Sequence, residues 1–203
     1  MSSTNRGGDR HVSDYYVTPK ACIETFMSAW LQDLVSEFHD DPRSVGARPD
    51  RARWLDPCAG GDPKHPSMSY PKVLTKLFEP EVGTIDIRDD SSAERIEDYL
   101  RAEITPDYYD VIITNPPFAI AKEVIEKALR DVAPNGYVVM LLRLNFFGGE
   151  LRRAFWEKQL PTWAYVHHRR MSFTDDKKTD SIEYMHAVWQ RDANPHFTML
   201  AVI

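Results

Sequence analysis

Four consecutive residues combine the groups needed to hold an amino group for reaction: Asn115, Pro116, Pro117 and Phe118, which follow an apolar, β-branched segment at 109–114. The side-chain oxygen of Asn115 and the main-chain carbonyl of Pro116 can accept both hydrogens of an amine on an aromatic ring. When both hydrogens are held, the nitrogen is pulled toward tetrahedral geometry and its lone pair is aimed at an electrophile. The prolines stiffen the turn by fixing φ, and Phe118 offers a flat face to a base. The sequence therefore predicts group transfer to an exocyclic amino nitrogen.

A second loop has the composition of a ligand-binding turn: Leu55-Asp56-Pro57-Cys58-Ala59-Gly60-Gly61-Asp62. It follows a short predicted strand, and its glycines let the main chain approach a ligand closely. We expect this loop to contact a small-molecule cofactor through Asp56, Cys58, Ala59 and Gly60. A third candidate is Asp86, near the end of a predicted strand at 82–87, because an acid at a strand tip binds ribose hydroxyls in nucleotide sites. Its neighbour Ile87 is expected to pack on the adenine ring.

These motifs need a scaffold, and the hydrophobic pattern predicts one in which strands and helices alternate. Helices are indicated at 18–34, where Thr18 is the expected N-cap, and at 70–78, 119–132 and 151–159, with a helix or turn at 92–100. Strands are indicated at 54–55, 82–87, 109–114, 137–142, 163–167 and 184–190. This order predicts an α/β fold with a Rossmann-like, mostly parallel sheet and ligand loops at the carboxyl ends of its strands. The last two strands are expected to form an antiparallel hairpin at the sheet edge.

The composition is that of one globular domain, with 203 residues, 42% of them hydrophobic. Residues 1–14 are polar and aperiodic and are expected to be flexible, which leaves 15–203 as a single catalytic domain. No apolar run reaches the roughly 18 residues of a membrane helix, and no secretory signal is recognisable, so we expect a cytoplasmic protein without membrane contact. Cys22 and Cys58 lack ligand-like spacing, so neither a disulfide nor a metal site is expected.

Charge is spread unevenly along the chain, whose net charge is −6. Residues 79–110 contain 11 acidic and 3 basic residues, whereas residues 143–178 contain 8 Lys or Arg and 4 acidic residues. A locally basic C-terminal third suits a surface that faces phosphates. A solvated, salt-bridged surface would have the same composition.

The tetrad and its surrounding loops resemble the amino-methyltransferase family that makes N6-methyladenine in DNA, particularly its small phage-type members. In that family the pattern [DNS]PP[YFW] is the catalytic motif, and its NPPF form points to adenine. The resemblance extends from Tyr15 to Gln190, and the motif order matches the γ arrangement. It implies an S-adenosyl-L-methionine-dependent DNA methyltransferase of a restriction-modification or phage type, with Asn115, Pro116, Pro117 and Phe118 as its catalytic tetrad.

The resemblance also implies an N-terminal cofactor segment of the Y-x-T-P type, which closes over the methionine end of the cofactor. Here it would consist of Tyr16, Thr18 and Pro19. Asp56 would lie near the amino group of the cofactor. The usual glycine motif is closer to DPxxGxG, and Asp62 replaces its last glycine in this chain.

Two further segments match the family. Asp98 and Tyr99 resemble its D-[FY]-L segment, in which the acid binds the adenine amino group of the cofactor and the aromatic ring packs beside it. In the loop between the two late strands, Phe173 is the candidate for a second stacking face. Four basic residues there are expected to meet phosphates: Arg169, Arg170, Lys177 and Lys178. Because a base inside a duplex cannot reach the cofactor, the substrate adenine is expected to be flipped out or single-stranded.

Enzymes of this family often carry a target-recognition domain after the catalytic one, and here almost nothing follows the last predicted strand. Base recognition is then expected from short loops, from the segment 43–53, or from a second protomer or partner subunit. RNA N6-adenine methyltransferases share the NPPF form, and enzymes that methylate a protein glutamine have NPPY. A non-catalytic nucleic-acid-binding module with the same fold would also fit the altered glycine loop. The sequence leaves these alternatives open.

Overall fold

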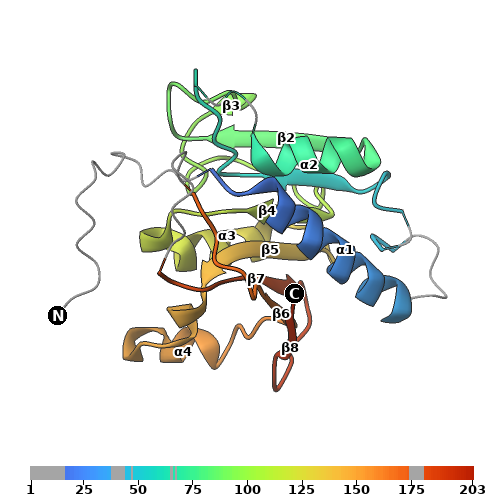
Figure 1. Cartoon of the computed structure of the whole chain (residues 1–203), viewed down its shortest axis with the longest axis vertical. Coiled ribbons are helices and arrows are strands. Elements are labelled where there is room, and N and C mark those ends of the chain that lie inside the picture. The colour runs from blue at the N-terminus through green and yellow to red at the C-terminus, as the bar shows by residue number, and fades with distance from the viewer. Residues whose placement is uncertain (1–16, 38–43, 47, 65, 67, 174–180) are drawn as a thin grey trace.

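The computed structural model describes residues 17–37, 44–46, 48–64, 66, 68–173 and 181–203 (Figure 1). The expected flexible segment 1–14 lies outside these ranges. So do three predicted site residues: Tyr16, Lys177 and Lys178.

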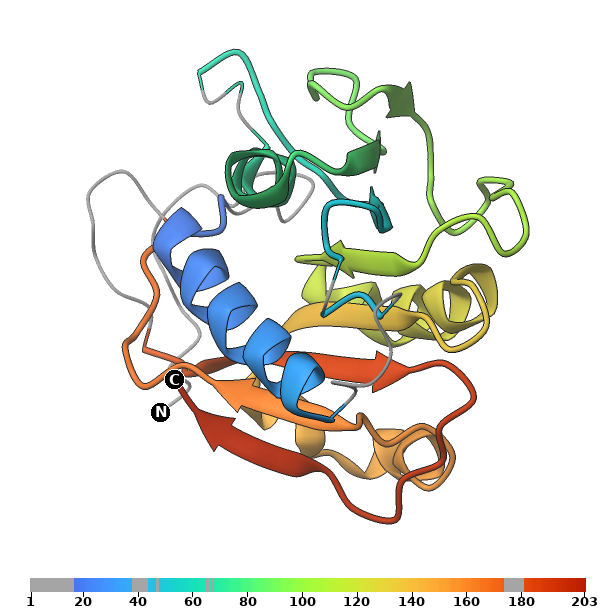
Figure 2. The ribbon, with the colours of Figure 1, turned by 90° about the vertical axis from the view of Figure 1, so that its right-hand side faces the viewer.

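One sheet of eight strands, in the order β3-β2-β1-β4-β5-β7-β6-β8, forms the centre of the molecule (Figure 2). The strands are β1 Arg53–Asp56, β2 Glu81–Asp86, β3 Arg95–Ile96, β4 Val111–Thr114, β5 Tyr137–Arg143, β6 Trp163–Val166, β7 Tyr184–Gln190 and β8 Met199–Val202. Strands β1 to β5 pair in parallel, and β7 runs antiparallel to both of its neighbours, β5 and β6. The predicted α/β fold with a mostly parallel sheet is therefore confirmed.

The expected antiparallel pair exists as β6 and β7, but its predicted position at the sheet edge is wrong. Strand β8 lies outside β6 and pairs with it in parallel. Strand β8 is only four residues long and follows a loop rich in turn-forming residues, so no alternating hydrophobic pattern predicts it. The segment 92–100, for which a helix or turn was predicted, contains the short strand β3 and turns.

Helices cover both faces of the sheet. Helices α1 (Lys20–Glu37) and α2 (Ser69–Phe78) lie on one face, and α3 (Ala121–Asp131) and α4 (Arg153–Trp156) lie on the other (Figure 2). The side chains of α1 at helical spacing are fully buried against the sheet: Ile23, Phe26, Met27 and Trp30. Helix α4 is much shorter than the predicted 151–159, because its first turn is the 3-10 helix η3 (Glu150–Arg152).

The parallel strands bring the predicted motifs to one edge of the sheet. Strands β1, β2 and β4 end at Asp56, Asp86 and Thr114, and Asn115 follows directly. The described part of segment 43–53 precedes β1 and lines a hollow at the opposite, amino edge together with Asp110 and the residues before β5. That segment is therefore not placed to read a base that enters beside Asn115.

Candidate active site

A single cavity joins the two main motifs, although they are about 60 residues apart in the chain. The cavity and its mouth comprise about 780 Å³, and the lining includes Asn115 and Pro117 together with Asp56, Pro57, Cys58 and Ala59. It lies at the carboxyl ends of the parallel strands, where α/β sheets bind their ligands.

The glycine loop is fixed by hydrogen bonds despite its altered sequence. Gly60 and Gly61 have φ values of 71° and 77°, which glycine adopts without strain. The Gly60 amide donates to Asp86 Oδ2 at 2.8 Å, and the Ser91 hydroxyl donates to the Gly60 carbonyl at 2.5 Å. Gly60 is not among the residues that line the cavity, so its place is in shaping the turn. Asp62, at the altered position, accepts the amide of Lys64 at 2.7 Å and forms a turn of its own.

Asp56 is a buried carboxylate at the floor of the cavity, 1% exposed. The Thr114 hydroxyl donates to Asp56 Oδ1 at 2.6 Å, and the Cys58 amide donates to the same oxygen at 3.3 Å. Burial raises the pKa of Asp56 to about 7, although these hydrogen bonds lower it in part. A cationic group bound beside Asp56 would favour its ionised form. Burial likewise raises the pKa of the Cys58 thiol, so this cysteine is not a nucleophile near neutral pH.

Asp86 and Ile87 also line the cavity. Both carboxylate oxygens of Asp86 accept main-chain amides, one from Gly60 and one from Arg88 at 2.9 Å. These bonds fix the carboxylate at the end of β2, and its ribose-binding role stays a prediction. Ile87 is 61% exposed and lines the cavity, so its apolar side chain is available to a flat ligand.

Asp98 and Tyr99 also line the cavity. Asp98 accepts the amide of Leu100 at 3.0 Å, which fixes the turn. The Tyr99 hydroxyl donates to Asp131 on α3 at 2.9 Å, and the ammonium of Lys127 lies 4.9 Å from the centre of the Tyr99 ring. Burial, followed by the charge of Asp131, raises the pKa of the Tyr99 phenol. The phenol is therefore a structural anchor that holds the ring against the cavity.

The segment before α1 closes the cavity near Asn115. Val17 and Thr18 line the cavity, and Pro19 does not. The Asn115 side-chain amide donates from Nδ2 to Thr18 Oγ1 at 3.1 Å. Because Nδ2 is bound to Thr18, the orientation of the amide group is fixed, and with it the position of Oδ1. Thr18 is 3% exposed and lies two residues before the start of α1. Its hydroxyl thus orients Asn115, which differs from the N-cap role predicted for it.

Aromatic side chains gather beside the tetrad, outside the cavity. The ring of Phe118 lies 5.8 Å from that of Tyr184, and the ring of Phe173 lies 4.9 Å from that of Tyr184. The two predicted stacking residues thus belong to one cluster, which they share with Tyr184. Pro116 is buried, whereas Phe118 is half-buried.

The described basic residues of the late loop lie at the surface. Arg169 and Arg170 are exposed in the loop that follows β6. Arg170 forms an ion pair with Glu183 at 3.3 Å, and both side chains are about half exposed. An exposed pair of this kind contributes little stability, so Arg170 can exchange this partner for a phosphate at small cost.

Sequence reasoning missed several residues of the site. Ser69 and Tyr70, at the start of α2, line the cavity, as does Arg88, which holds the glycine loop by donating to the Gly61 carbonyl at 3.2 Å. The start of α2 could have been inferred, because a helix that follows a strand-end loop begins at the carboxyl edge of the sheet. Tyr184 carried no such signal, because its position depends on the antiparallel pairing of β5 and β7.

No group of three or more His, Cys, Asp or Glu side chains is arranged to hold a metal ion within those ranges. None of the described helices has both the length and the apolar character needed to cross a membrane.

Several solved structures share this architecture. A protein from Listeria monocytogenes described as a class I S-adenosylmethionine-dependent methyltransferase has a TM-score of 0.60 at 15% identity, over 92% of this chain. The modification subunit described for a type I restriction enzyme from Vibrio vulnificus has a TM-score of 0.59 at 14% identity, over 97% of this chain. A protein from Pyrococcus horikoshii described as an RNA methyltransferase has a TM-score of 0.56 at 16% identity, over 93% of each chain.

The chain therefore has the fold of the class I methyltransferases. It spans 65% of the length of the Listeria protein and 48% of the length of the Vibrio subunit. No protein-family profile and no curated protein sequence matches the chain. The likeness to these structures is thus one of fold alone.

Proposed function

We propose that this protein transfers a methyl group from S-adenosyl-L-methionine to N6 of adenine in DNA. The observation that carries the proposal is the junction of two motifs at one cavity. Asn115 and Pro117 of the tetrad line the same cavity as Asp56 and Ala59 of the glycine loop. A donor bound along the loop would therefore lie beside the amine acceptors of the tetrad.

The cavity has groups that suit each part of S-adenosyl-L-methionine. Asp56 offers a carboxylate to the amino group of the methionine part, and Asp86 offers one to the ribose hydroxyls. Ile87 and Tyr99 offer apolar surface to the adenine ring, and Asp98 offers an acceptor for its amino group. These roles agree with the family resemblance.

The residues of the tetrad would act by orientation. Asn115 Oδ1 and the Pro116 carbonyl accept the two N6 hydrogens, while Thr18 holds the Asn115 amide through its hydroxyl at 3.1 Å. Bound S-adenosyl-L-methionine would supply the electrophilic methyl group; N6 would bond to the methyl carbon as the carbon–sulfur bond breaks, and would then lose one proton to water. No strong base is needed, because the leaving group is a neutral thioether. Positioning and fixed dipoles supply the catalysis.

Phe118 and Phe173 suit the two sides of an extruded base. An adenine that stacks on Phe118 must leave a duplex or come from a single strand. We propose that residues 15–203 form a single catalytic domain. Sequence specificity would come from a second protomer or a partner subunit, a role that agrees with the restriction modification subunit among the structural neighbours.

The test is expression in cells that lack adenine methylation, followed by mass spectrometry of the digested DNA. Wild-type protein is expected to produce N6-methyladenine, and Asn115→Ala is expected to bind the cofactor with unchanged affinity while losing most turnover. Parallel reactions with labelled cofactor and separate DNA, RNA and protein pools identify the substrate. Label in RNA or protein alone would replace DNA as the substrate, and absence of cofactor binding would favour a non-catalytic module. Methylation by Asn115→Ala at the wild-type rate would remove Asn115 from the mechanism.

A further inference from the structure

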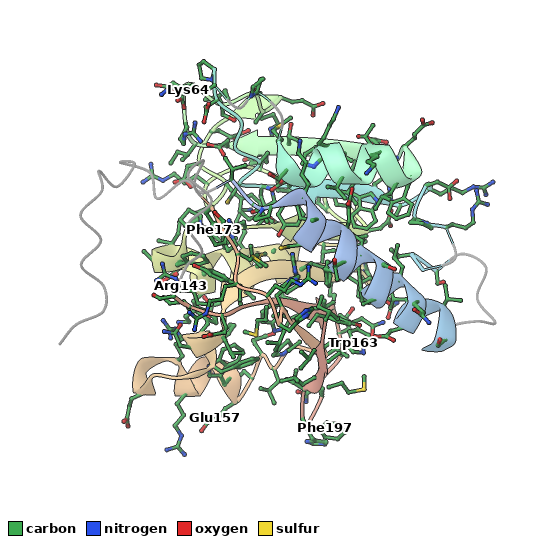
Figure 3. All side chains as sticks on the ribbon, in the orientation of Figure 1. Lys64, Arg143, Glu157, Trp163, Phe173 and Phe197 are labelled. Carbon is green, nitrogen blue, oxygen red and sulfur yellow. The ribbon has the colours of Figure 1, made fainter. Side chains whose placement is uncertain are left out.

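Arg143 is an arginine beside the tetrad to which sequence analysis gave no role. It is the last residue of β5, the strand that pairs in parallel with β4. Thr114 of β4 is opposite Met140 of β5, so Arg143 extends three residues further, to the level of the Asn115–Phe118 turn. Figure 3 labels Arg143 and Phe173 on the same side of the molecule.

The guanidinium of Arg143 stacks on the ring of Phe118. Its central carbon lies 4.4 Å from the ring centre, a cation–π contact. Arg143 is opposite Tyr184 in the β5–β7 ladder, so it also borders the aromatic cluster that contains Phe173. One face of Phe118 is therefore covered by a cation, and a base that stacks on this ring would use the opposite face.

The charge of Arg143 is not compensated within the described part of the chain. There, no carboxylate forms an ion pair with Arg143, and its buried Nε–H has no hydrogen-bond acceptor. Neighbouring arginines differ. Arg170 pairs with Glu183, and Arg152 donates to the Gly148 carbonyl at 2.8 Å. A buried donor without an acceptor is unfavourable in an isolated protein, so a ligand that carries acceptors and negative charge would be bound here.

We propose that Arg143 binds a phosphate of the DNA strand next to the base that stacks on Phe118, and that it thereby positions this base. The inference rests on the proposed function and names the contact that holds the substrate. Phosphate matches the planar, multidentate donor set of arginine. Because the same guanidinium contacts Phe118, one side chain couples the binding of a DNA phosphate to the stacking of the base. Arg143 is thus a positioning residue.

The experiment compares the wild type with three variants. Arg143→Met removes the charge but keeps a long apolar side chain that can pack on Phe118, and Arg143→Lys keeps the charge but loses the planar fork. The matched control is Arg51→Met, which makes the same change in net charge at an exposed position on the opposite edge of the sheet. The probe is a fluorescein-labelled, mixed-sequence, single-stranded oligodeoxynucleotide, and its binding is followed by anisotropy across a series of salt concentrations.

We expect Arg143→Met to weaken oligonucleotide binding about tenfold and to reduce the slope of log K against log salt by about 0.7, the value for one phosphate contact with a single strand. Arg143→Lys is expected to keep most of that slope, and Arg51→Met to behave as wild type. In methylation assays, KM for DNA should rise in Arg143→Met while cofactor affinity stays unchanged. A purely structural role would lower thermal stability without changing the salt slope.

Unchanged affinity and slope in Arg143→Met, with methylation by the wild type intact, would overturn this inference alone. If Arg143→Met does not fold, the same readings are taken on Arg143→Gln. Wild-type protein that transfers no methyl group, but whose DNA affinity still depends on Arg143, would instead overturn the proposed function alone. If Arg143→Met loses affinity only for an RNA oligonucleotide of the same sequence and keeps its affinity for the DNA oligonucleotide, the assignment to DNA is overturned.

Discussion

Replacing Asp56 by asparagine separates the stability of this protein from its proposed function. Asp56 is 1% exposed, and burial raises its pKa to about 7. The substitution Asp56→Asn keeps the shape and leaves an oxygen to accept from the Thr114 hydroxyl and the Cys58 amide. It removes the charge that is unfavourable in the buried site. We therefore expect the variant without ligand to be more stable than the wild type at pH 8.

The size of the effect follows from the pKa. A value of about 7 in the folded protein, against an ordinary value of 3.8, corresponds to about 4 kcal/mol as an upper limit. The folded state holds the proton more tightly than the unfolded chain, so wild-type stability falls as pH rises from about 4 to 7 and then levels off. The advantage of Asp56→Asn should accordingly be a few kcal/mol at pH 8 and should vanish near pH 4.

The assay is urea unfolding at several pH values between 4 and 8, followed by the fluorescence of buried tryptophans such as Trp30 and Trp54. Asp89→Asn is the matched control, because Asp89 is exposed. It should change the free energy of unfolding by less than about 0.5 kcal/mol. Calorimetry with S-adenosyl-L-methionine should show roughly 10- to 100-fold weaker binding to Asp56→Asn, since a charge-assisted hydrogen bond is lost.

Two results would refute the reasoning about Asp56. One is a variant that is less stable than the wild type at pH 8. The other is a stability difference that stays constant from pH 4 to pH 8. Unchanged cofactor affinity would leave the stability argument intact but would remove Asp56 from the binding site.

Two further predictions concern the neighbours of the site. Thr18→Val removes the acceptor for Asn115 Nδ2 and should lower kcat about 2- to 10-fold at unchanged cofactor affinity; equal kcat values would show that this hydrogen bond does not orient Asn115. His167 and His186 are buried and joined by a hydrogen bond of 2.8 Å, and burial lowers the pKa of His167 to about 4 and that of His186 well below its ordinary value. Because both must stay neutral in the fold, stability should fall as pH decreases from 6.5 toward 4. The measurement is urea unfolding of Asp56→Asn, because this variant lacks the opposite pH dependence that Asp56 causes. A free energy of unfolding that stays constant between pH 6.5 and pH 4 in this variant would contradict the prediction.

Much of the fold could be predicted from the sequence, because its signals are local. The strands at 109–114 and 137–142 are runs of β-branched or aliphatic residues, and α1 has apolar residues at helical spacing. Such patterns act through the main chain and neighbouring side chains. Strand β8 was missed because its four residues depend on the existing edge of β6 for their hydrogen bonds.

The sequence alone identified the residues that are proposed to carry the chemistry. A stiff Asn-Pro-Pro-Phe turn after a buried strand, and an acidic glycine turn after another, are defined by residue type and order. In a parallel sheet such strand ends must meet at one edge, so their proximity was implied as well.

Only the tertiary structure decided how those residues are surrounded. It turned Gly60 away from the cavity, paired Thr18 with Asn115, and brought Arg143 onto Phe118 through the register of β5 beside β4. It also made Asp56 a weak acid, because a pKa responds to burial and nearby charge rather than to residue type. These properties depend on contacts between residues that are far apart in the chain, and no local pattern specifies them.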